Sequence, residues 1–274
     1  MKLSKDLEKK LNLLISFLKG KRVMVAFSGG VDSSLLAYLS NKYAEETLLI
    51  TEKSILYPDD EIEEASQFAK CYNIPHNIIT RDPLKDKEFQ CNPLNRCYLC
   101  KTGLYNDIIE IKNSRKFDLI LDGSNMDDLS DYRPGMQALK ELSISTPYID
   151  FNIGKDEIRE ISKHYNLAVQ SKPSMACFSS RIPYGQIINE KKVLMIRKAE
   201  KYLKDTFKLE QVRVRLHEGE LGRIEFLPSD LKKILTSNNI EAIRDKLKEF
   251  GFTYITVDLE GFRSGSMNEV LDLE

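Results

Sequence analysis

The sequence predicts an α/β fold over its first two thirds, followed by a smaller region of the α+β class. Short apolar runs alternate with longer amphipathic runs as far as residue 121, as expected for a parallel sheet with helices on both faces. Small and polar residues directly follow three of these apolar runs. Beyond residue 189 the expected strands are closely spaced, which favours antiparallel pairing in that part of the chain.

The first region begins with an amphipathic helix, since the leucines of residues 1–20 recur near one helical face. The expected elements that follow are strand 23–27, helix 33–43, strand 47–51, helix 59–70, strand 77–80, a turn-rich stretch 81–96, helix 98–112 and strand 117–121. Ligands bind at the carboxyl ends of the strands in such sheets. We therefore expect Ser28, Thr51 and residues 122–124 to meet in one crevice.

The periodicity changes in the second half of the chain. A helix is expected over 155–164, whereas residues 171–177 have too little periodicity for a regular element. The later elements are helix 190–204, strand 211–216, strand 222–226, helices within 229–248 and strand 252–257. The change of pattern lies between residues 175 and 188, so we assign residues 1–178 and 179–274 to two domains.

Composition and charge restrict the class of protein. The charges are balanced, 41 basic against 42 acidic residues, and this disfavours a large RNA partner, because nucleic-acid-binding proteins usually carry a basic excess. No apolar run approaches the ~20 residues that span a bilayer, and residues 1–20 do not resemble a signal peptide. Five cysteines, an odd number, favour thiol or metal chemistry over disulfides. We therefore expect a cytoplasmic protein without membrane attachment.

Residues 23–34 predict an anion site, because an apolar strand breaks abruptly into a glycine turn and a helix start. Gly29 and Gly30 allow backbone N–H groups to approach an anion, since no Cβ stands in the way. The helix dipole adds positive potential. Further donors are the hydroxyls of Ser28, Ser33 and Ser34. The pattern lacks the Gly-Lys-Ser/Thr of a Walker loop. A tight turn capped by Asp32 is the alternative without a ligand.

The segment Ser-Gly-Gly-Val-Asp-Ser at 28–33 resembles the SGGxDS loop of the PP-loop ATP pyrophosphatases. The resemblance implies a PP-loop fold of the adenine nucleotide α-hydrolase type, whose loop grips the β,γ-pyrophosphate while ATP is split into AMP and pyrophosphate. Asp32 and a bound Mg²⁺ would neutralise the leaving pyrophosphate. The residues expected to bind the nucleotide are Ala26, Ser28, Gly29, Gly30, Asp32, Ser33, Ser34, Thr51, Gly123 and Lys101.

Lys101 has an alternative role, and so does an acidic pair outside this list, Asp127 and Asp128. Lys101 follows a cysteine motif directly and would meet an AMP phosphate, but it would equally fit an exposed helix surface. Asp127 and Asp128 follow Gly123 closely, and they are suited either to holding Mg²⁺ or to capping a helix.

The cysteines predict a metal site. Cys97 and Cys100 form a CxxC, and Cys177 stands alone far along the chain. A CxxC fits zinc, iron–sulfur or redox chemistry. Structural zinc takes four ligands, whereas three thiolates leave one iron of a 4Fe–4S cluster open to a ligand such as hydrosulfide. Arg181 and nearby hydroxyls would favour the Cys177 thiolate, although Cys177 also fits a buried structural role. Cys91 is either a fourth ligand or a bystander.

Arg213 and Arg215 alternate with two valines on an expected strand, so both side chains point to one face. Two guanidinium groups on one face form a fork for a phosphate group. A solvated strand face with salt bridges is the other interpretation.

The chain as a whole resembles the LarE-type ATP-dependent sulfur transferases of nickel-pincer cofactor biosynthesis. The similarity spans nearly the whole sequence, and the blocks around Cys177 and near the C-terminus are its most specific parts. The matching stretches are 28–40, 92–101, 122–128, 131–135, 177–185, 212–215 and 258–268.

This resemblance implies an enzyme that adenylylates the carboxylates of pyridinium-3,5-biscarboxylic acid mononucleotide and converts them to thiocarboxylates. In one branch of the family, the cysteine at the Cys177 position gives up its own sulfur and becomes dehydroalanine. In another branch, a CxxC joins that cysteine to hold a 4Fe–4S cluster with a labile extra sulfide. The CxxC of this chain resembles the second branch, which implies Cys97, Cys100 and Cys177 as cluster ligands and Cys177 and Asp32 as catalytic residues.

The resemblance also implies a role for the C-terminal domain. The phosphate of the mononucleotide substrate would bind Ser180, Arg181, Arg213 and Arg215. The same domain would take part in forming a homo-oligomer, which is a hexamer in this family.

Three other functions fit parts of the sequence. A tRNA 2-thiolation enzyme shares the SGGxDS loop and a CxxC with a distant cysteine, but usually needs a basic surface or an RNA-binding zinc module. A PP-loop synthetase or amidotransferase partner that uses ammonia would hold structural zinc on the cysteines. A nucleotide sensor without catalysis would release no pyrophosphate.

Overall fold

The computed structural model describes residues 3–130, 134–171 and 176–270, and this part of the chain divides into two compact units. The first unit runs to Ser54 and also includes Pro58–Asp82 and the chain from Asn95 to residue 171. The second unit includes Ile55–Tyr57, Pro83–Leu94 and the chain from Ala176 onward. Parts of two stretches quoted above, residues 131–133 and 172–175, lie outside the described residues.

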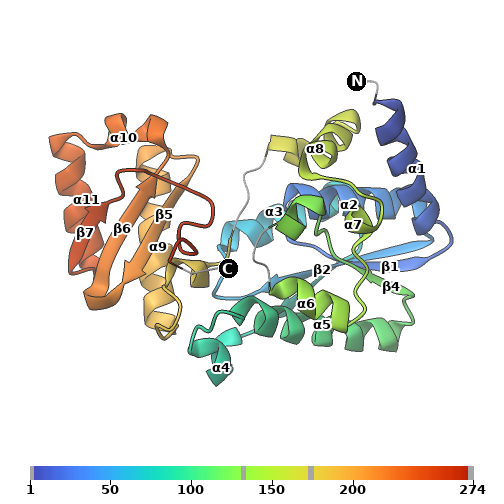
Figure 1. Ribbon diagram of the computed structural model, residues 1–274, viewed down its shortest axis with the longest axis horizontal. Helices are drawn as coiled ribbons and strands as arrows, with labels where there is room; N and C mark the ends of the chain where they lie inside the picture. Colours follow the sequence, from blue (N-terminus) through green and yellow to red (C-terminus); the bar gives the residue numbers. More distant parts are fainter. Residues whose placement is uncertain (1–2, 131–133, 172–175, 271–274) are drawn as a thin grey trace. The chain divides into compact units, whose positions relative to one another are not determined.

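The first unit is a four-stranded parallel sheet covered by helices (Figure 1). Its α-helices and strands are α1 (Lys5–Leu18), β1 (Arg22–Ala26), α2 (Val31–Tyr43), β2 (Glu46–Lys53), α3 (Asp59–Cys71), β3 (His76–Thr80), α5 (Arg96–Arg115), β4 (Leu119–Leu121), α6 (Gly135–Glu141), α7 (Pro147–Asp150) and α8 (Lys155–His164). The strand order is β3-β2-β1-β4, with Met24 level with Leu48 on one side and with Ile120 on the other. The expected α/β class with a parallel sheet is confirmed.

The alternation of side chains along β1 explains why helices cover both faces of this sheet. Val23 and Val25 pack with the leucines of α1 and α2 and with the isoleucines of α8. Met24 points to the opposite face and packs with Tyr105 and Ile108 of α5. Each apolar strand residue therefore buries its side chain on one of two cores, which is why the strands read as continuous apolar runs.

The second unit holds a three-stranded sheet with the order β5-β6-β7. Its α-helices and strands are α4 (Lys87–Gln90), α9 (Glu190–Phe207), β5 (Val212–His217), β6 (Leu221–Phe226), α10 (Pro228–Ile234), α11 (Ser237–Glu249) and β7 (Tyr254–Val257). Strands β5 and β6 are antiparallel, as expected, whereas β6 and β7 are parallel. The parallel pairing follows from the connection between the two strands. Helices α10 and α11 lie between β6 and β7 in the sequence, and they return the chain to the end of the sheet at which β6 begins.

Short helices are the elements that sequence periodicity does not predict. The helices α4, α6 and α7 have four to seven residues, too few for a repeating apolar stripe. Helix α4 lies inside the stretch expected to be turns, and a 3₁₀ turn at Phe178–Arg181 lies just after the stretch expected to be irregular. None of the helices in the described part of the chain is long and apolar enough to cross a membrane.

The segment 83–94 is fastened to the second unit by Asn92. This asparagine is fully buried, and its Nδ2 donates to the carbonyl oxygens of Ile182 (3.1 Å) and Pro183 (2.7 Å). Its own carbonyl accepts from the N–H of Gly185 at 2.9 Å. The division expected after residue 178 did not include this return of an earlier segment, and a division into independent domains stays a prediction.

We expect Asn92→Ala to destabilise the second unit, because two buried carbonyl groups lose their donor. The loss should be about 1–3 kcal/mol in the free energy of unfolding, measured by urea titration. Asn166→Ala is the matched control, since Asn166 has a similar positive φ (55° against 53°) but an exposed side chain. Equal losses in the two variants would show that backbone strain alone, and not the hydrogen bonds of Asn92, causes the effect.

Candidate functional site

The turn between β1 and α2 has the geometry of an anion-binding loop. Gly29 has a positive φ of 71°, a conformation that favours glycine, and Gly30 is the N-cap of α2. Among the residues that the structure describes, no side chain caps this helix end. The hydroxyls of Ser28 and Ser33 lie 3.1 Å apart, and the N–H of Gly30 donates to Ser28 Oγ at 3.3 Å. The loop therefore gathers hydroxyl and N–H donors at the positive end of a helix dipole.

Asp32 and Ser34 bring two oxygen atoms without hydrogen-bond partners to this helix start. Within the described residues, Asp32 Oδ1 and Ser34 Oγ are buried and make no hydrogen bond. The other carboxylate oxygen of Asp32 accepts from Asn125 Nδ2 at 3.1 Å. Burial raises the pKa of Asp32; Lys155 and Arg159 oppose this rise and Asp128 adds to it. A buried oxygen without a partner is costly in free energy, so this arrangement is suited to a bound cation or ligand.

Asp127 and Asp128 follow β4 in a 3₁₀ turn, Met126–Ser130. Asp127 Oδ2 accepts the N–H of Lys155, the first residue of α8, at 2.6 Å. Asp128 Oδ2 accepts the N–H of Asn125 at 3.0 Å. Asp127 therefore acts at the start of a helix, as the capping interpretation required. Asp128 faces Asp32 closely enough to influence its pKa.

These side chains are suited to Mg²⁺. Mg²⁺ is usually bound by one or two carboxylates together with phosphates and water, and Asp32 Oδ1 offers one such oxygen without a competing partner in the described part of the chain. No group of three or more His, Cys, Asp or Glu among the described residues is arranged to hold a metal ion by itself. A cation at Asp32 would therefore need further ligands from a bound phosphate or from water.

The carboxyl end of β4 contacts the same helix start. A Cβ on Gly123 would lie 3.1 Å from the backbone nitrogen of Ser33, so only glycine allows this approach without displacement. Asp122 is paired with Lys101 (Nζ to Oδ2, 3.2 Å) and accepts from the hydroxyl of Tyr105. Burial alone would raise the pKa of Asp122, but Lys101 and the hydrogen bonds outweigh it and lower the pKa. Lys101 is thus held at the strand end by a buried carboxylate.

Ala26 is the last residue of β1, whereas Thr51 lies two residues before the end of the neighbouring strand β2, which is longer than the expected strand 47–51. Thr51 is buried, and its hydroxyl donates to the carbonyl oxygen of Phe27 at 2.7 Å. The hydroxyl oxygen of Thr51 also lies 2.7 Å from His76 Nε2. Because the hydroxyl proton is donated to Phe27, this oxygen accepts a hydrogen bond from the His76 nitrogen. The ring of His76 packs edge-on against Phe27. The hydroxyl of Thr51 is therefore used for hydrogen bonds within the protein.

The cysteines expected to bind a cluster belong to both units. Cys97 and Cys100 lie in the first turns of α5, three residues apart and so on one face of the helix, in the first unit. Cys177 belongs to the second unit. None of the five cysteines, all of which lie in the described residues, forms a disulfide; Cys71, Cys91 and Cys97 are exposed, and Cys100 and Cys177 are partly exposed. The cluster stays a prediction.

The backbone around Cys177 is held by Arg181 in the 3₁₀ turn Phe178–Arg181. Arg181 Nη1 donates to the carbonyl oxygens of Ala176 (2.7 Å) and Cys177 (3.0 Å) and to Ser180 Oγ (2.8 Å). Ser179 Oγ lies 2.8 Å from the sulfur of Cys177. Arg181 therefore orders the segment that carries Cys177 while its guanidinium is fully buried.

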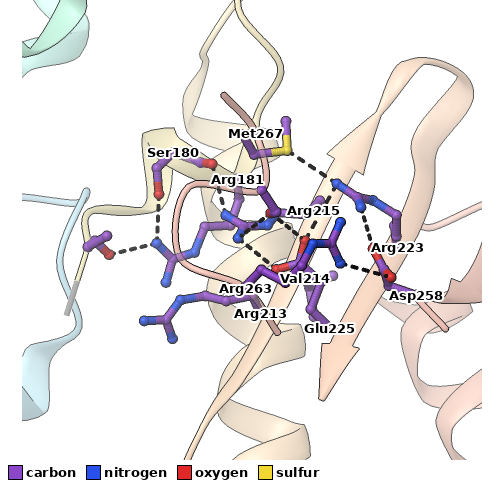
Figure 2. Close-up of polar contacts among 12 residues, drawn as sticks. Ser180, Arg181, Arg213, Val214, Arg215, Arg223, Glu225, Asp258, Arg263 and Met267 are labelled. Carbon is purple, nitrogen blue, oxygen red and sulfur yellow. Dashed lines mark hydrogen bonds and ion pairs between the residues drawn. The ribbon is translucent and has the colours of Figure 1, made fainter. Parts of the chain in front are cut away.

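Arg181, Arg213 and Arg215 gather in a buried cluster over β5 and β6, where Figure 2 shows them beside Arg223 and Glu225. Arg181 pairs with Glu200 of α9 (Nε to Oε1, 2.9 Å), and Arg215 pairs with Glu225 of β6 (Nη2 to Oε2, 2.7 Å). Arg213 lies 4.0 Å from Glu200. The two strand arginines share one face, as expected, and that face carries the salt bridges of the alternative interpretation, but the arginines are only 3% and 5% exposed, so the face is not solvated.

The buried part of this cluster has a surplus positive charge. Three arginines (Arg181, Arg213, Arg215) face two glutamates (Glu200, Glu225), all of them buried. Burial and the neighbouring charges of Arg181 and Arg215 lower the pKa of Arg213 to about 10. Burial opposes the charge of Glu200, but its arginine partners hold its pKa below the usual value. An anion would balance the surplus charge, and Arg213 is the arginine least compensated by the carboxylates.

The C-terminal segment 258–268 covers this cluster. Ser266 Oγ donates to Glu225 Oε1 at 2.7 Å and accepts from Arg215 Nη2 at 3.0 Å. The guanidinium of Arg213 lies 5.5 Å from the ring centre of Phe262. Arg223 Nη2 lies 3.5 Å from the sulfur of Met267, a contact drawn in Figure 2. Segment 258–268, which the sequence analysis identified as one of the matching stretches, is thus part of the arginine cluster.

Several residues that hold these sites were not expected from the sequence. Tyr148 is fully buried and its hydroxyl donates to the carbonyl oxygen of Asp32 at 3.0 Å. Asn125 holds the Asp32 carboxylate, and Glu200 is the shared partner of Arg181 and Arg213. Asn125 lies within the matching stretch 122–128, a signal that could have indicated its role. Tyr148 and Glu200 have no such signal, because each comes from a distant segment.

Comparisons with known proteins identify relatives that span the chain. No family model matches. An uncharacterised protein of Synechocystis is 37% identical over 267 residues, 97% of this chain and 99% of that protein. The pyridinium-3,5-bisthiocarboxylic acid mononucleotide synthase of Lactiplantibacillus plantarum is 30% identical over 265 residues, 96% of this chain and 95% of that enzyme. A tRNA-specific 2-thiouridylase of Clostridioides difficile is 25% identical over 213 residues, 62% of this chain and 58% of that enzyme.

The surplus charge predicts opposite effects on stability for two arginines. Arg181→Met should lose about 3–5 kcal/mol of unfolding free energy, because it leaves Glu200 buried without its main partner. Arg213→Met should be at least as stable as the wild type, because it removes a desolvated charge that neighbouring arginines repel. Urea titration at pH 7 checks both variants. A comparable loss in Arg213→Met would show that Arg213 is a structural ion-pair partner rather than a surplus charge.

Proposed function

The chain belongs to the family of LarE-type sulfur transferases, and from this membership we propose that it is an ATP-dependent sulfur insertase. Its substrate would be pyridinium-3,5-biscarboxylic acid mononucleotide, whose carboxylates it would adenylylate and convert to thiocarboxylates. The relative from Lactiplantibacillus plantarum, named for the bisthiocarboxylic acid product, supports this choice of substrate. The reaction would serve the biosynthesis of a nickel-pincer cofactor.

The start of α2 supports adenylylation most directly. The buried oxygens of Asp32 and Ser34 lack partners among the described residues, and they lie beside a glycine turn whose donors suit a pyrophosphate. Mg²⁺, when bound to Asp32, would neutralise charge on the phosphates of ATP. Lys101, held by Asp122 at the end of β4, would meet the phosphate that stays on AMP.

Adenylylation would give the carboxylate of the substrate a good leaving group. A carboxylate is a poor acyl donor, because the oxide that must leave is strongly basic. Attack of one carboxylate oxygen on the α-phosphorus of ATP forms a mixed anhydride and expels pyrophosphate. A sulfur nucleophile then attacks the acyl carbon and expels AMP, leaving a thiocarboxylate after transfer of the sulfur. The loop donors stabilise the expelled pyrophosphate in the first of these steps.

The sulfur source is proposed to involve Cys97, Cys100 and Cys177. These three described cysteines form no disulfide and are at least partly exposed, and three thiolates suit a 4Fe–4S cluster with one open iron. Such a cluster, when bound, would supply a labile sulfide. Arg181 holds the backbone of the Cys177 segment in a defined conformation, and Ser179 places a hydroxyl at the sulfur. Donation of the sulfur of Cys177 itself is the alternative within the same family.

The arginine cluster supports the binding of a phosphate group on the mononucleotide. A phosphate contributes at least one negative charge, which would balance the surplus positive charge of the buried cluster. Arg213 would make the principal contact, since it lies 4.0 Å from Glu200, a longer ion pair than the 2.9 Å of Arg181 with Glu200 and the 2.7 Å of Arg215 with Glu225. The oligomer expected from the resemblance remains part of this proposal.

The weaker similarity to tRNA-specific 2-thiouridylases favours a second candidate, in which the activated oxygen belongs to a base of tRNA. Both candidates share the step that activates oxygen with ATP. The balanced charge of the chain disfavours RNA as the acceptor. Sulfur transfer to the mononucleotide, with none to tRNA, would separate the two functions.

Asp32→Asn tests adenylylation and should have two effects. Pyrophosphate release with ATP and the mononucleotide should fall at least about a hundredfold, because removing one charged transition-state contact has a cost of this size. Stability should rise at pH 7, since the pKa of Asp32 is raised in the folded state and the wild type loses stability as pH rises through that pKa. The difference in Tm should shrink in acid, where Asp32 is protonated. Unchanged pyrophosphate release would contradict adenylylation at this loop.

Cys177→Ala and Cys91→Ala distinguish the proposed sulfur sources. After anaerobic reconstitution, Cys177→Ala should lose iron and acid-labile sulfide, whereas Cys91→Ala should keep both and transfer sulfur normally. In the sacrificial alternative, the wild type transfers sulfur once and its mass falls by about 34 Da, the loss of H₂S from a cysteine thiol. A mass spectrum after turnover checks this. Dehydroalanine at position 177 in protein with a full cluster would overturn the cluster mechanism and keep the family assignment.

A further inference from the structure

Helix α8 brings two cations to the start of α2, and nothing in the function described so far uses them. Lys155 is the first residue of α8 and Arg159 lies four residues later, so the two side chains are neighbours on one face of the helix. Both are partly exposed. Within the described part of the chain, the ammonium group of Lys155 makes no ion pair, although the helix start that carries it lies among carboxylates.

A continuous chain of hydrogen bonds places the start of α8 beside Asp32. Asn125 donates to Asp32 Oδ2 at 3.1 Å and accepts from the N–H of Asp127 at 3.0 Å. Asp127 Oδ2 in turn accepts the N–H of Lys155 at 2.6 Å. A Cβ on Gly154 would lie 3.0 Å from the same carboxylate oxygen, so the helix start approaches the acidic turn closely. The position of Lys155 is therefore set by the residues that hold Asp32.

The electrostatics agree with this placement. Lys155, Arg159 and Asp128 all lie close enough to Asp32 to interact electrostatically with its side chain. Two cations thus act on a site that holds two carboxylates, Asp32 and Asp128. Without the cations, these carboxylates would repel the phosphates that the glycine turn is built to receive.

We propose that Lys155 and Arg159 form the second wall of the pyrophosphate site and contact the β- and γ-phosphates of ATP. This inference rests on the proposed function and adds two residues that neither the loop motif nor the arginine cluster contains. The loop supplies N–H and hydroxyl donors from one side, and α8 supplies two positive charges from the other. AMP, which has only the α-phosphate, makes no contact with this wall.

The selectivity for pyrophosphate gives a test that a structural role would not satisfy. Binding of ATP, Mg²⁺-pyrophosphate and AMP is measured by calorimetry for the wild type and for Lys155→Gln, Arg159→Gln and Lys155→Arg. In Lys155→Gln and Arg159→Gln, the Kd for ATP and for pyrophosphate should rise about tenfold, the effect of losing a charge-assisted contact. The Kd for AMP should stay unchanged, and Lys155→Arg should retain most of the affinity for pyrophosphate.

Lys163→Gln is the matched control, because Lys163 is an exposed lysine at the other end of the same helix. It should bind all three ligands as the wild type does. Unchanged pyrophosphate affinity in Lys155→Gln and Arg159→Gln, or an equal loss for AMP, would overturn the inference. If both variants bind normally while Asp32→Asn loses ATP, the proposed function stands and this inference alone fails. If the wild type binds neither ATP nor pyrophosphate, both fail.

Discussion

The charge of Asp32 is the constraint on which the first unit depends. A carboxylate buried at the start of a helix costs free energy, and one of its oxygens has no hydrogen-bond partner in the described residues. The surrounding elements limit this cost without removing it. Asn125 holds one oxygen, Tyr148 fixes the backbone at the same residue, and Gly123 allows β4 to approach the helix start. The fold thus keeps a destabilising group in place, which is the expected cost of a site prepared for a ligand.

The second unit holds a different kind of unsatisfied group. Its buried arginines exceed its buried glutamates by one, so the cluster over β5 and β6 is short of negative charge, whereas at the start of α2 a carboxylate oxygen lacks a hydrogen-bond partner among the described residues. The two features correspond to two kinds of ligand. A carboxylate with a free oxygen suits a metal ion that arrives with phosphates, and a desolvated guanidinium suits a phosphate directly. This difference in charge agrees with the assignment of nucleotide binding to one unit and of the substrate's phosphate to the other.

The segment 258–268 contributes to the burial of the arginine cluster. Ser266 connects Arg215 to Glu225, and Phe262 covers Arg213. Exclusion of water strengthens the interaction of these charges with one another and with any anion that reaches them. The segment has little regular structure, so its identity in the sequence reflects the contacts that it makes with the cluster rather than a propensity to form an element.

The sequence by itself determined the class of the first unit and the position of its loop. The apolar runs of β1, β2 and β4 are visible because each strand is buried on both faces, and residues 28–34 are contiguous, so local spacing is enough to recognise them. The alternation of Arg213 and Arg215 likewise predicted that they share a face.

Only the tertiary structure decided which groups are buried, paired or left without a partner. Glu200 comes from α9, Tyr148 from α7 and Lys155 from α8, and no local pattern links these residues to the sites that they complete. Likewise, no local pattern predicted that segment 83–94 belongs to the second unit, because the hydrogen bonds of Asn92 that fix it there reach residues far away in the sequence. Periodicity reports which side of an element is apolar, but burial and charge balance depend on what other segments bring to that side.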